Sequence, residues 1–109
     1  QPYLANNKTE VERVKHLIET TSSTGYAACA QAIKKLDQLQ DLARVSVPTL
    51  ILVGADDPST PPAASEVIHK HVTHSKLEVV EHASHFLNVE QFKHFNDNLL
   101  TFLNDQKIM

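Results

Sequence analysis

Two aspartates and two histidines stand at corresponding places in the second half of the sequence. Asp56 and Asp57 follow one short apolar run, and a second apolar run precedes His82 and His85. An aspartate that binds one imidazole nitrogen fixes the tautomer and stabilises the protonated ring, which leaves the other nitrogen free to act as a base. If the two loops meet, the sequence supplies the acid and the base for an attack by a nucleophile.

The two apolar runs have the character of parallel strands. Residues 49–53 are apolar or β-branched without a break, which predicts a strand buried on both faces. Residues 76–81 predict a second strand, and residues 62–72, which start with a proline, predict a helix between them. Strands joined by such a crossover are expected to be parallel, with their exit loops at the same edge of the sheet.

Helices are predicted on either side of this unit. Asn7 is expected to cap a first helix, and a second helix is expected to begin near residue 24 and to carry Tyr26 and Cys29 on an apolar stripe. The favoured interpretation of this stripe is core packing, with a ligand pocket at Tyr26 or Cys29 as the alternative. One short helical turn is predicted before the first strand, and Asn88 is expected to cap a long final helix.

Composition narrows the classes of function. The chain has 109 residues, enough for one domain at most, and its formal charge of −3 without a basic run argues against nucleic-acid or anionic-membrane binding. No apolar run approaches the roughly 20 residues of a membrane-spanning helix. The single cysteine, Cys29, cannot form an intrachain disulfide, so the cytoplasm is the expected compartment.

Two other interpretations apply to the same residues. A metal site is suggested by five histidines in the second half, namely His69, His71, His74, His82 and His85. However, His69 and His71 are two residues apart on a predicted helix and so face different ways, whereas zinc needs three or four convergent ligands. Asp57 taken alone is typical of a turn that bonds its own backbone. The combination of acid and histidine loops at one edge favours catalysis over either interpretation.

Three segments carry a resemblance to a known family. The sequence V-P-T-L-I-L-V-G-A-D-D-P-S-T-P at 47–61 resembles the seventh strand and acid loop of α/β-hydrolases, and A-S-H-F-L-N-V-E-Q at 83–91 resembles their histidine loop. Together with G-Y-A-A-C-A-Q-A-I at 25–33, these segments are similar to 3-oxoadipate enol-lactonases, also called β-ketoadipate enol-lactone hydrolases. The resemblance covers residues 24–103.

The resemblance implies a role for individual residues. It places the acid at Asp57, three residues after Gly54, and the base at His85. Tyr26 would belong to a helical cap that covers the substrate and influences its selection. The implied reaction is hydrolysis of the enol-lactone of 3-oxoadipate in the β-ketoadipate pathway of aromatic catabolism, with no metal or organic cofactor.

The nucleophile of this family is missing from the sequence. It sits in a G-x-S-x-G turn that precedes the acid and the base, whereas the two glycines here, Gly25 and Gly54, are 54 − 25 = 29 positions apart. Ser59 and Ser84 adjoin the two loops but neither lies on such a turn. We therefore expect the chain to supply the acid and base but to be inactive alone.

The expected organisation is the C-terminal portion of an α/β-hydrolase fold. Residues 1–45 are expected to be the end of the helical cap, and residues 46–109 the strand-helix-strand-helix part of the core. Such a portion leaves sheet edges uncovered, so a homo-oligomer or association with a missing N-terminal portion is expected. The alternative is a non-catalytic remnant or interaction module; the partner of a complete enzyme would be a small lactone or ester.

Overall fold

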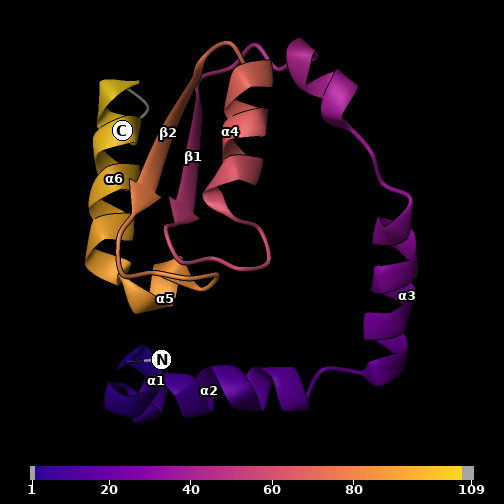
Figure 1. Ribbon diagram of the computed structural model, residues 1–109, viewed down its shortest axis with the longest axis vertical. Coiled ribbons are helices and arrows are strands. Elements are labelled where there is room, and N and C mark those ends of the chain that lie inside the picture. Colours follow the sequence, from indigo (N-terminus) through magenta and orange to yellow (C-terminus); the bar gives the residue numbers. More distant parts are fainter. Residues whose placement is uncertain (1, 107–109) are drawn as a thin grey trace. The chain divides into compact units, whose positions relative to one another are not determined.

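The computed structural model describes residues 2–106, and the chain divides into two compact units, Gln1–Asp37 and Gln38–Met109. The first unit contains the helices α1 (Pro2–Asn6), α2 (Lys8–Glu19) and α3 (Ser23–Lys34). The second contains η1 (Leu39–Arg44), β1 (Thr49–Gly54), α4 (Pro62–His71), β2 (Ser75–Val80), α5 (Leu87–Glu90) and α6 (Phe92–Asp105) (Figure 1). Within the described residues, no helix is both long enough and apolar enough to cross a lipid bilayer.

The first unit corrects two expectations. The side chain of Asn7 does not cap α2; its amide donates instead to the carbonyl of Tyr3 in α1, at 3.0 Å. The stripe on α3 is not core, since Tyr26 is 71% exposed and no residue of α3 is buried. Within the described residues of this unit, α1 and α2 do not bury the stripe on α3.

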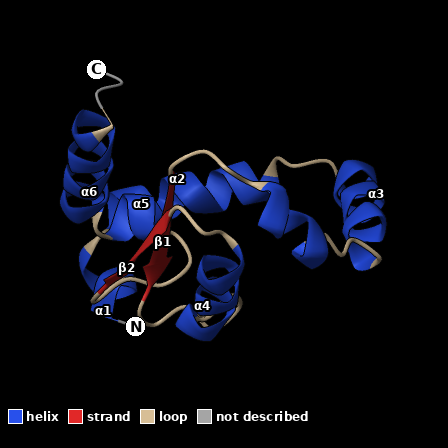
Figure 2. Cartoon of the chain, turned by 90° about the horizontal axis from the view of Figure 1, so that it is seen from above, coloured by secondary structure: helices blue, strands red, loops and turns tan. Residues whose placement is uncertain are grey.

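The second unit confirms the parallel strand pair. β1 and β2 pair in parallel with Thr49 opposite Ser75 and Gly54 opposite Val80, so both strands end at the same level. Both α4 and α6 contact both strands, and two perpendicular views place these helices on opposite faces of the sheet (Figure 2). The result is a helix-sheet-helix arrangement with both exit loops at one edge.

Most of the buried core gathers at the carboxyl end of the strands, and Val72 lies at the opposite end, three residues before β2. The apolar members of this core are Val53, Val72, Val80 and Ala83. Residues 49–53 were expected to be buried throughout, yet only Val53 of that range is buried and the others are half-buried. β1 pairs only with β2 among the described residues, and this leaves its other edge open.

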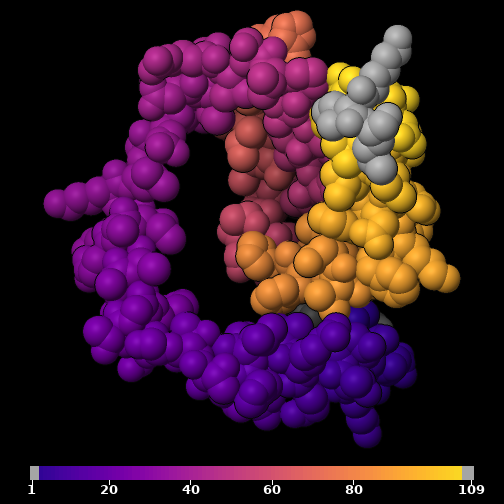
Figure 3. Space-filling model, turned by 180° about the vertical axis from the view of Figure 1, so that it is seen from behind, coloured from indigo at the N-terminus to yellow at the C-terminus, as the bar shows by residue number. Residues whose placement is uncertain are grey.

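The final helix is divided in two. α5 and α6 meet at Gln91, whose backbone (φ −131°, ψ 54°) is not helical. The Gln91 side chain donates to the carbonyl of His82 at 3.2 Å, which holds this residue against the histidine loop. Asn88 lies inside α5 and is therefore not the cap that was expected. The space-filling view shows α6, in yellow, lying against the rest of its unit (Figure 3).

Candidate active site

The loops that leave β1 and β2 are joined by backbone hydrogen bonds. The N–H of Ala55 donates to the carbonyl of Val80, and the N–H of Asp56 donates to the carbonyl of Ala83, both at 2.9 Å. These bonds continue the parallel ladder by one step beyond the strands. They bring the acid loop and the histidine loop to a fixed separation.

Gly54 allows this close approach. A Cβ at this position would overlap the backbone carbonyl oxygens of Ala83 and Ser84. Backbone oxygens cannot move aside as a flexible side chain can, so a residue larger than glycine would separate the loops. The glycine before the two aspartates thus has a packing role in the site.

The carboxylate of Asp57 is buried and fastened to its own turn. Asp57 is 5% exposed. Its Oδ1 accepts hydrogen bonds from the N–H groups of Ser59 and Thr60, each at 3.0 Å. This is the local turn that the sequence Gly-x-x-Asp-Pro is typical of, and it uses only one of the two carboxylate oxygens.

The second oxygen of Asp57 faces His85. Oδ2 lies 2.9 Å from Nδ1 of His85 and accepts the hydroxyl of Thr60 at 3.0 Å. Oγ1 of Thr60 is itself 3.3 Å from Nδ1 of His85. The structure therefore brings together the two residues that the sequence singled out and adds a threonine to them.

The protonation states follow from these contacts. Burial alone would raise the pKa of Asp57, but hydrogen bonds from the Thr60 N–H, the His85 ring, the Thr60 hydroxyl and the Ser59 N–H lower that pKa from 3.8 to about 2. At neutral pH the carboxylate is ionised and has no proton, so Nδ1 of His85 must carry the proton of their shared hydrogen bond. In the neutral ring Nε2 is then the basic nitrogen, and it has no hydrogen-bond partner among residues 2–106.

The histidine loop is held by the helix that follows it. Oε2 of Glu90 accepts the N–H of Ser84 at 2.9 Å, and His82 adopts a left-handed backbone conformation with φ 57°. The ring of Phe86 packs edge-on against the His85 ring, with centroids 5.8 Å apart and an interplanar angle of 81°. The His85 side chain remains 56% exposed, so a reacting molecule can reach it.

Other polar residues near the site stay outside this arrangement. The side chain of Asp56 is exposed and makes no hydrogen bond with the described part of the chain. His82 contributes its carbonyl to Gln91 rather than its ring to the aspartate. The hydroxyl of Ser84 donates to the backbone carbonyl of Asp56 at 3.4 Å and so does not bond the acid-base pair. None of the three takes the place of Asp57 or His85.

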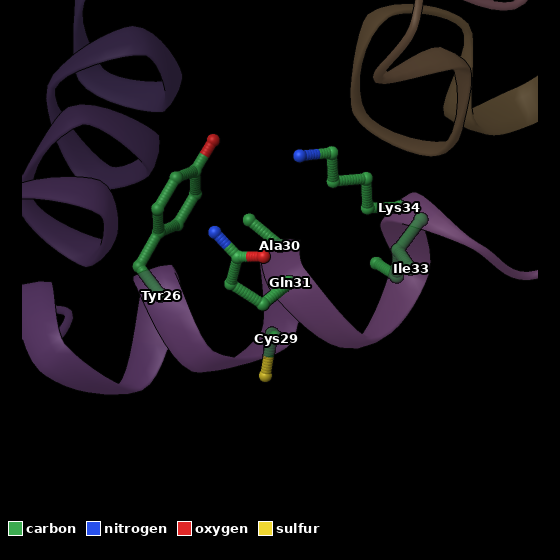
Figure 4. Close-up of a pocket in the computed structure, with 6 residues that line it drawn as sticks. All are labelled: Tyr26, Cys29, Ala30, Gln31, Ile33 and Lys34. Carbon is green, nitrogen blue, oxygen red and sulfur yellow. The ribbon is translucent and has the colours of Figure 1, made fainter.

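Tyr26 belongs to the other unit. It lines an open pocket on α3 together with Cys29, Ala30, Gln31, Ile33 and Lys34. Figure 4 shows the Tyr26 hydroxyl, the Gln31 amide and the Lys34 ammonium on one side of the helix and Cys29 on the other. The pocket is formed by a single helix and combines apolar surface with three polar groups.

The remaining histidines do not assemble into a metal centre. Across residues 2–106, no group of three or more histidine, cysteine, aspartate or glutamate side chains converges as metal ligands would. Nδ1 of His69 pairs with Oγ of Ser75 at 2.7 Å, and Nδ1 of His71 with the carbonyl of Val67 at 2.8 Å. These two rings form hydrogen bonds within α4 and between α4 and the start of β2.

Comparison with known proteins places this geometry in a family. The family model described as the alpha/beta hydrolase fold matches residues 4–92, which include both loops and the Asp57–His85 pair. The chain belongs to the α/β-hydrolase family. A hydrolase from Pseudomonas aeruginosa superposes with a TM-score of 0.86 at 30% identity, over 94% of this chain and 38% of that hydrolase.

Two curated relatives come from Acinetobacter baylyi. 3-Oxoadipate enol-lactonase 2 is 39% identical over 94 residues, which are 86% of this chain and 35% of the lactonase. 3-Oxoadipate enol-lactonase 1 is 34% identical over 89 residues, or 82% of this chain and 33% of that lactonase. The α/β-hydrolase chain thus spans about a third of the length of these relatives.

Two residues of the site have no role in the sequence analysis. Thr60 stands three residues after Asp57, the spacing at which a turn residue can bond an aspartate side chain, and this spacing is the signal that could have found it. Glu90 has no comparable local signal, because the residue it binds, Ser84, lies six positions away.

Proposed function

We propose that this chain is the acid- and base-bearing portion of a serine α/β-hydrolase that opens the enol-lactone of 3-oxoadipate. One observation carries the proposal: a buried, ionised carboxylate, Asp57, bonds Nδ1 of an exposed histidine, His85, at 2.9 Å and leaves its Nε2 open. The similarity to two 3-oxoadipate enol-lactonases supports the substrate class. The place of such a reaction would be aromatic catabolism.

In the proposed mechanism, a serine outside this chain attacks the lactone carbonyl. Nε2 of His85 takes the serine proton and gives it to the departing enol oxygen, which opens the ring. Nε2 then takes a proton from the water that attacks the acyl-serine and gives this proton to the serine oxygen, which releases the acid in its enol form. The enol tautomerises to the ketone, 3-oxoadipate. Asp57 stays ionised and stabilises the imidazolium in both steps.

Tyr26 is proposed to contribute to substrate selection. Its hydroxyl stands beside the Gln31 amide and the Lys34 ammonium on one side of α3. The ammonium of Lys34 has no ion-pair partner within the described residues. The pocket surface is mainly apolar, and these three groups beside it would supply hydrogen-bond donors to the carboxylate of an anionic lactone. The proposal includes a cytoplasmic location, because the single cysteine offers no intrachain disulfide.

The deciding experiment begins with the coding sequence upstream of residue 1. An in-frame G-x-S-x-G motif would identify the polypeptide to express, and its hydrolysis of the enol-lactone would be followed by loss of the substrate. We expect His85→Ala to lower kcat on the order of 10⁶-fold, as removal of a triad histidine does. The control is His94→Ala, an exposed histidine on α6 that should keep the original rate.

Two results would contradict the proposal. One is a start codon with its own promoter directly at this chain and no elbow motif upstream. The other is lactone hydrolysis that continues in the His85→Ala protein at a rate comparable with the original. A fluorophosphonate that labels active serines should not react with the 109-residue chain, whose sequence contains no elbow.

The second candidate is an interaction module that keeps the hydrolase scaffold without catalysis. It is supported by the exposed apolar side chains of the second unit, among them Phe92 at 55%, Leu100 at 46% and Val79 at 42%. The open edge of β1 adds unpaired backbone groups to this surface. Under this alternative, the chain associates with itself or with a separate N-terminal portion and hydrolyses nothing.

A further inference from the structure

Thr60 touches every polar group of the acid-base pair that faces the protein. Its N–H donates to Oδ1 of Asp57 and its hydroxyl to Oδ2, both at 3.0 Å. Its Oγ1 also lies 3.3 Å from Nδ1 of His85. One residue thus holds both oxygens of the carboxylate, and this fixes the plane in which Asp57 meets the ring.

The protons available to Asp57, Thr60 and His85 determine which of their atoms donate hydrogen bonds and which accept them. Oδ2 of Asp57, Oγ1 of Thr60 and Nδ1 of His85 lie within 3.3 Å of one another. The ionised carboxylate supplies no proton, so the hydroxyl and the ring supply one each. Oδ2 of Asp57 accepts two hydrogen bonds when the Thr60 hydroxyl and the His85 ring both donate to it, and the neutral ring then carries its proton on Nδ1. The opposite tautomer would point the lone pair of Nδ1 at a carboxylate.

The exposure of His85 makes this anchoring important. More than half of its side chain surface is open, at 56%, and its described ring neighbour is the edge-on Phe86. Packing therefore does little to fix the ring, and the polar contacts at Nδ1 must do so. A carboxylate free to rotate would offer the ring several geometries, whereas one held at both oxygens offers a single geometry.

We propose that Thr60 is a positioning residue of this site, which directs Oδ2 of Asp57 at Nδ1 of His85 and so keeps Nε2 as the base. The meaning of this role for hydrolysis rests on the proposed function. The tautomer itself is a property of the 109-residue chain and can be measured without a substrate.

The test is the nuclear magnetic resonance spectrum of the chain with ¹⁵N-labelled histidine. The variant Thr60→Val keeps the side chain shape and the backbone N–H but removes the hydroxyl. We expect the ratio of the Nδ1–H to the Nε2–H tautomer of neutral His85 to fall about fivefold, as the loss of one hydrogen bond implies. We also expect the carboxylate of Asp57 to titrate at a higher pH, because one of its donors is gone.

Rescue and control variants separate positioning from general damage. Thr60→Ser restores the hydroxyl and should restore the tautomer ratio. Thr101→Val makes the same exchange at an exposed position of α6 and should leave His85 unchanged. If Thr60→Val does not fold, Thr60→Ala removes the same hydroxyl and is measured instead. An unchanged tautomer ratio in a folded variant without the hydroxyl overturns the inference.

The inference and the proposed function fail separately. In the longer polypeptide, Thr60→Val should lower kcat with little change in KM, since Thr60 acts through His85. If hydrolysis requires His85 but the tautomer ratio does not change when the Thr60 hydroxyl is removed, the role of Thr60 is overturned and the proposed function stands. If the tautomer follows Thr60 but hydrolysis proceeds without His85, the function is overturned and the geometry stands.

Discussion

Asp57 uses its two carboxylate oxygens for different partners. Oδ1 accepts the N–H groups of Ser59 and Thr60, and Oδ2 accepts the ring of His85 together with the Thr60 hydroxyl. The sequence offered a structural turn and a catalytic acid as competing interpretations of this residue. The turn is observed and the partnership with His85 coexists with it, because each needs only one oxygen.

The free energy of unfolding at acidic pH should depend on Asp57. Its pKa is about 2 in the folded chain and near 3.8 otherwise. Between these values the unfolded chain binds more protons than the folded chain, so the free energy of unfolding rises with pH. The contribution of Asp57 to stability is therefore lost as the pH falls from about 4 to about 2. We expect Asp57→Asn to lack this component, as measured by urea unfolding at a series of pH values.

The control for this measurement is Asp56→Asn. Its carboxylate is the neighbouring one, is exposed and bonds no described residue. The chain with this substitution should keep the pH dependence of the original. If Asp57→Asn loses stability over the same pH interval and by the same amount as the original chain, the hydrogen bonds to Asp57 do not stabilise the fold.

At the scale of the elements, the site depends on the contact between two loops. Gly54→Ala would place a methyl group against the carbonyls of Ala83 and Ser84. We expect it to lower the free energy of unfolding by about 1–3 kcal/mol, as overpacking usually does. It should also separate Asp57 from His85, and this would appear as a change in the histidine ring resonances.

Gly25→Ala is the matched control for this substitution. A Cβ at Gly25 meets the nearest atom at 3.6 Å, an ordinary contact distance, and Gly25 lies in the first turn of α3. Replacing glycine with alanine there should leave stability unchanged or raise it by up to about 1 kcal/mol. Equal losses for the two variants would mean that the Gly54 contact is not special.

The junction of α5 with the histidine loop gives a further prediction. Glu90→Ala removes the acceptor of the Ser84 N–H, a charge-assisted bond of 2.9 Å. We expect a loss of about 1–2 kcal/mol, whereas Glu90→Gln keeps an acceptor oxygen and should lose less. Glu66→Ala, at an exposed position of α4, is the control for removing a charge. The measurement is urea unfolding at neutral pH.

Local patterns were sufficient to find the elements of the second unit. β1 and α4 begin at the residues that the apolar run and the proline predicted, and β2 begins one residue earlier than expected. The division at Gln91 was missed, since the apolar stripe continues through it; the Gln91 side chain bonds His82, nine positions away, and no local pattern shows this contact. The burial of β1 was overestimated, since an apolar run records what the strand can pack against, not how many neighbours this chain supplies.

The candidate site divides in the same way. The meeting of Asp57 with His85 followed from parallel strands and their shared edge, and the choice of these two over Asp56 and His82 came from the family resemblance. Thr60 was missed although its spacing from Asp57 is a local signal; its contact with Nδ1 of His85, 25 positions away, has no such signal. Tyr26 lies in the other unit, and its part in any substrate site stays a prediction.

At the scale of the whole molecule, the second unit exposes apolar surface that an ordinary monomer would cover. We expect the chain to self-associate, with a sedimentation coefficient that rises with protein concentration. The double variant Phe92→Lys/Leu100→Lys, at side chains 55% and 46% exposed, should weaken this dependence because it places charge on the α6 surface.

The control adds the same charges without removing apolar surface. Asn96→Lys/Asn104→Lys changes two exposed positions of the same helix and should keep more of the association. A single species of monomer mass for the original chain at high concentration would show that the exposed surface of α6 and the strand edge does not drive self-association.

The common end of the two strands restricts where the chain can change length. Gly54 and Val80 form the last pair of the ladder, and one extra residue in either strand would advance its loop by about 3.3 Å. That step exceeds the 2.9 Å between the atoms that join Asp57 to His85. Insertions and deletions should therefore be tolerated at the far end of the sheet, around the turn that leads from α4 into β2, and be absent from functional variants between Gly54 and Asp57.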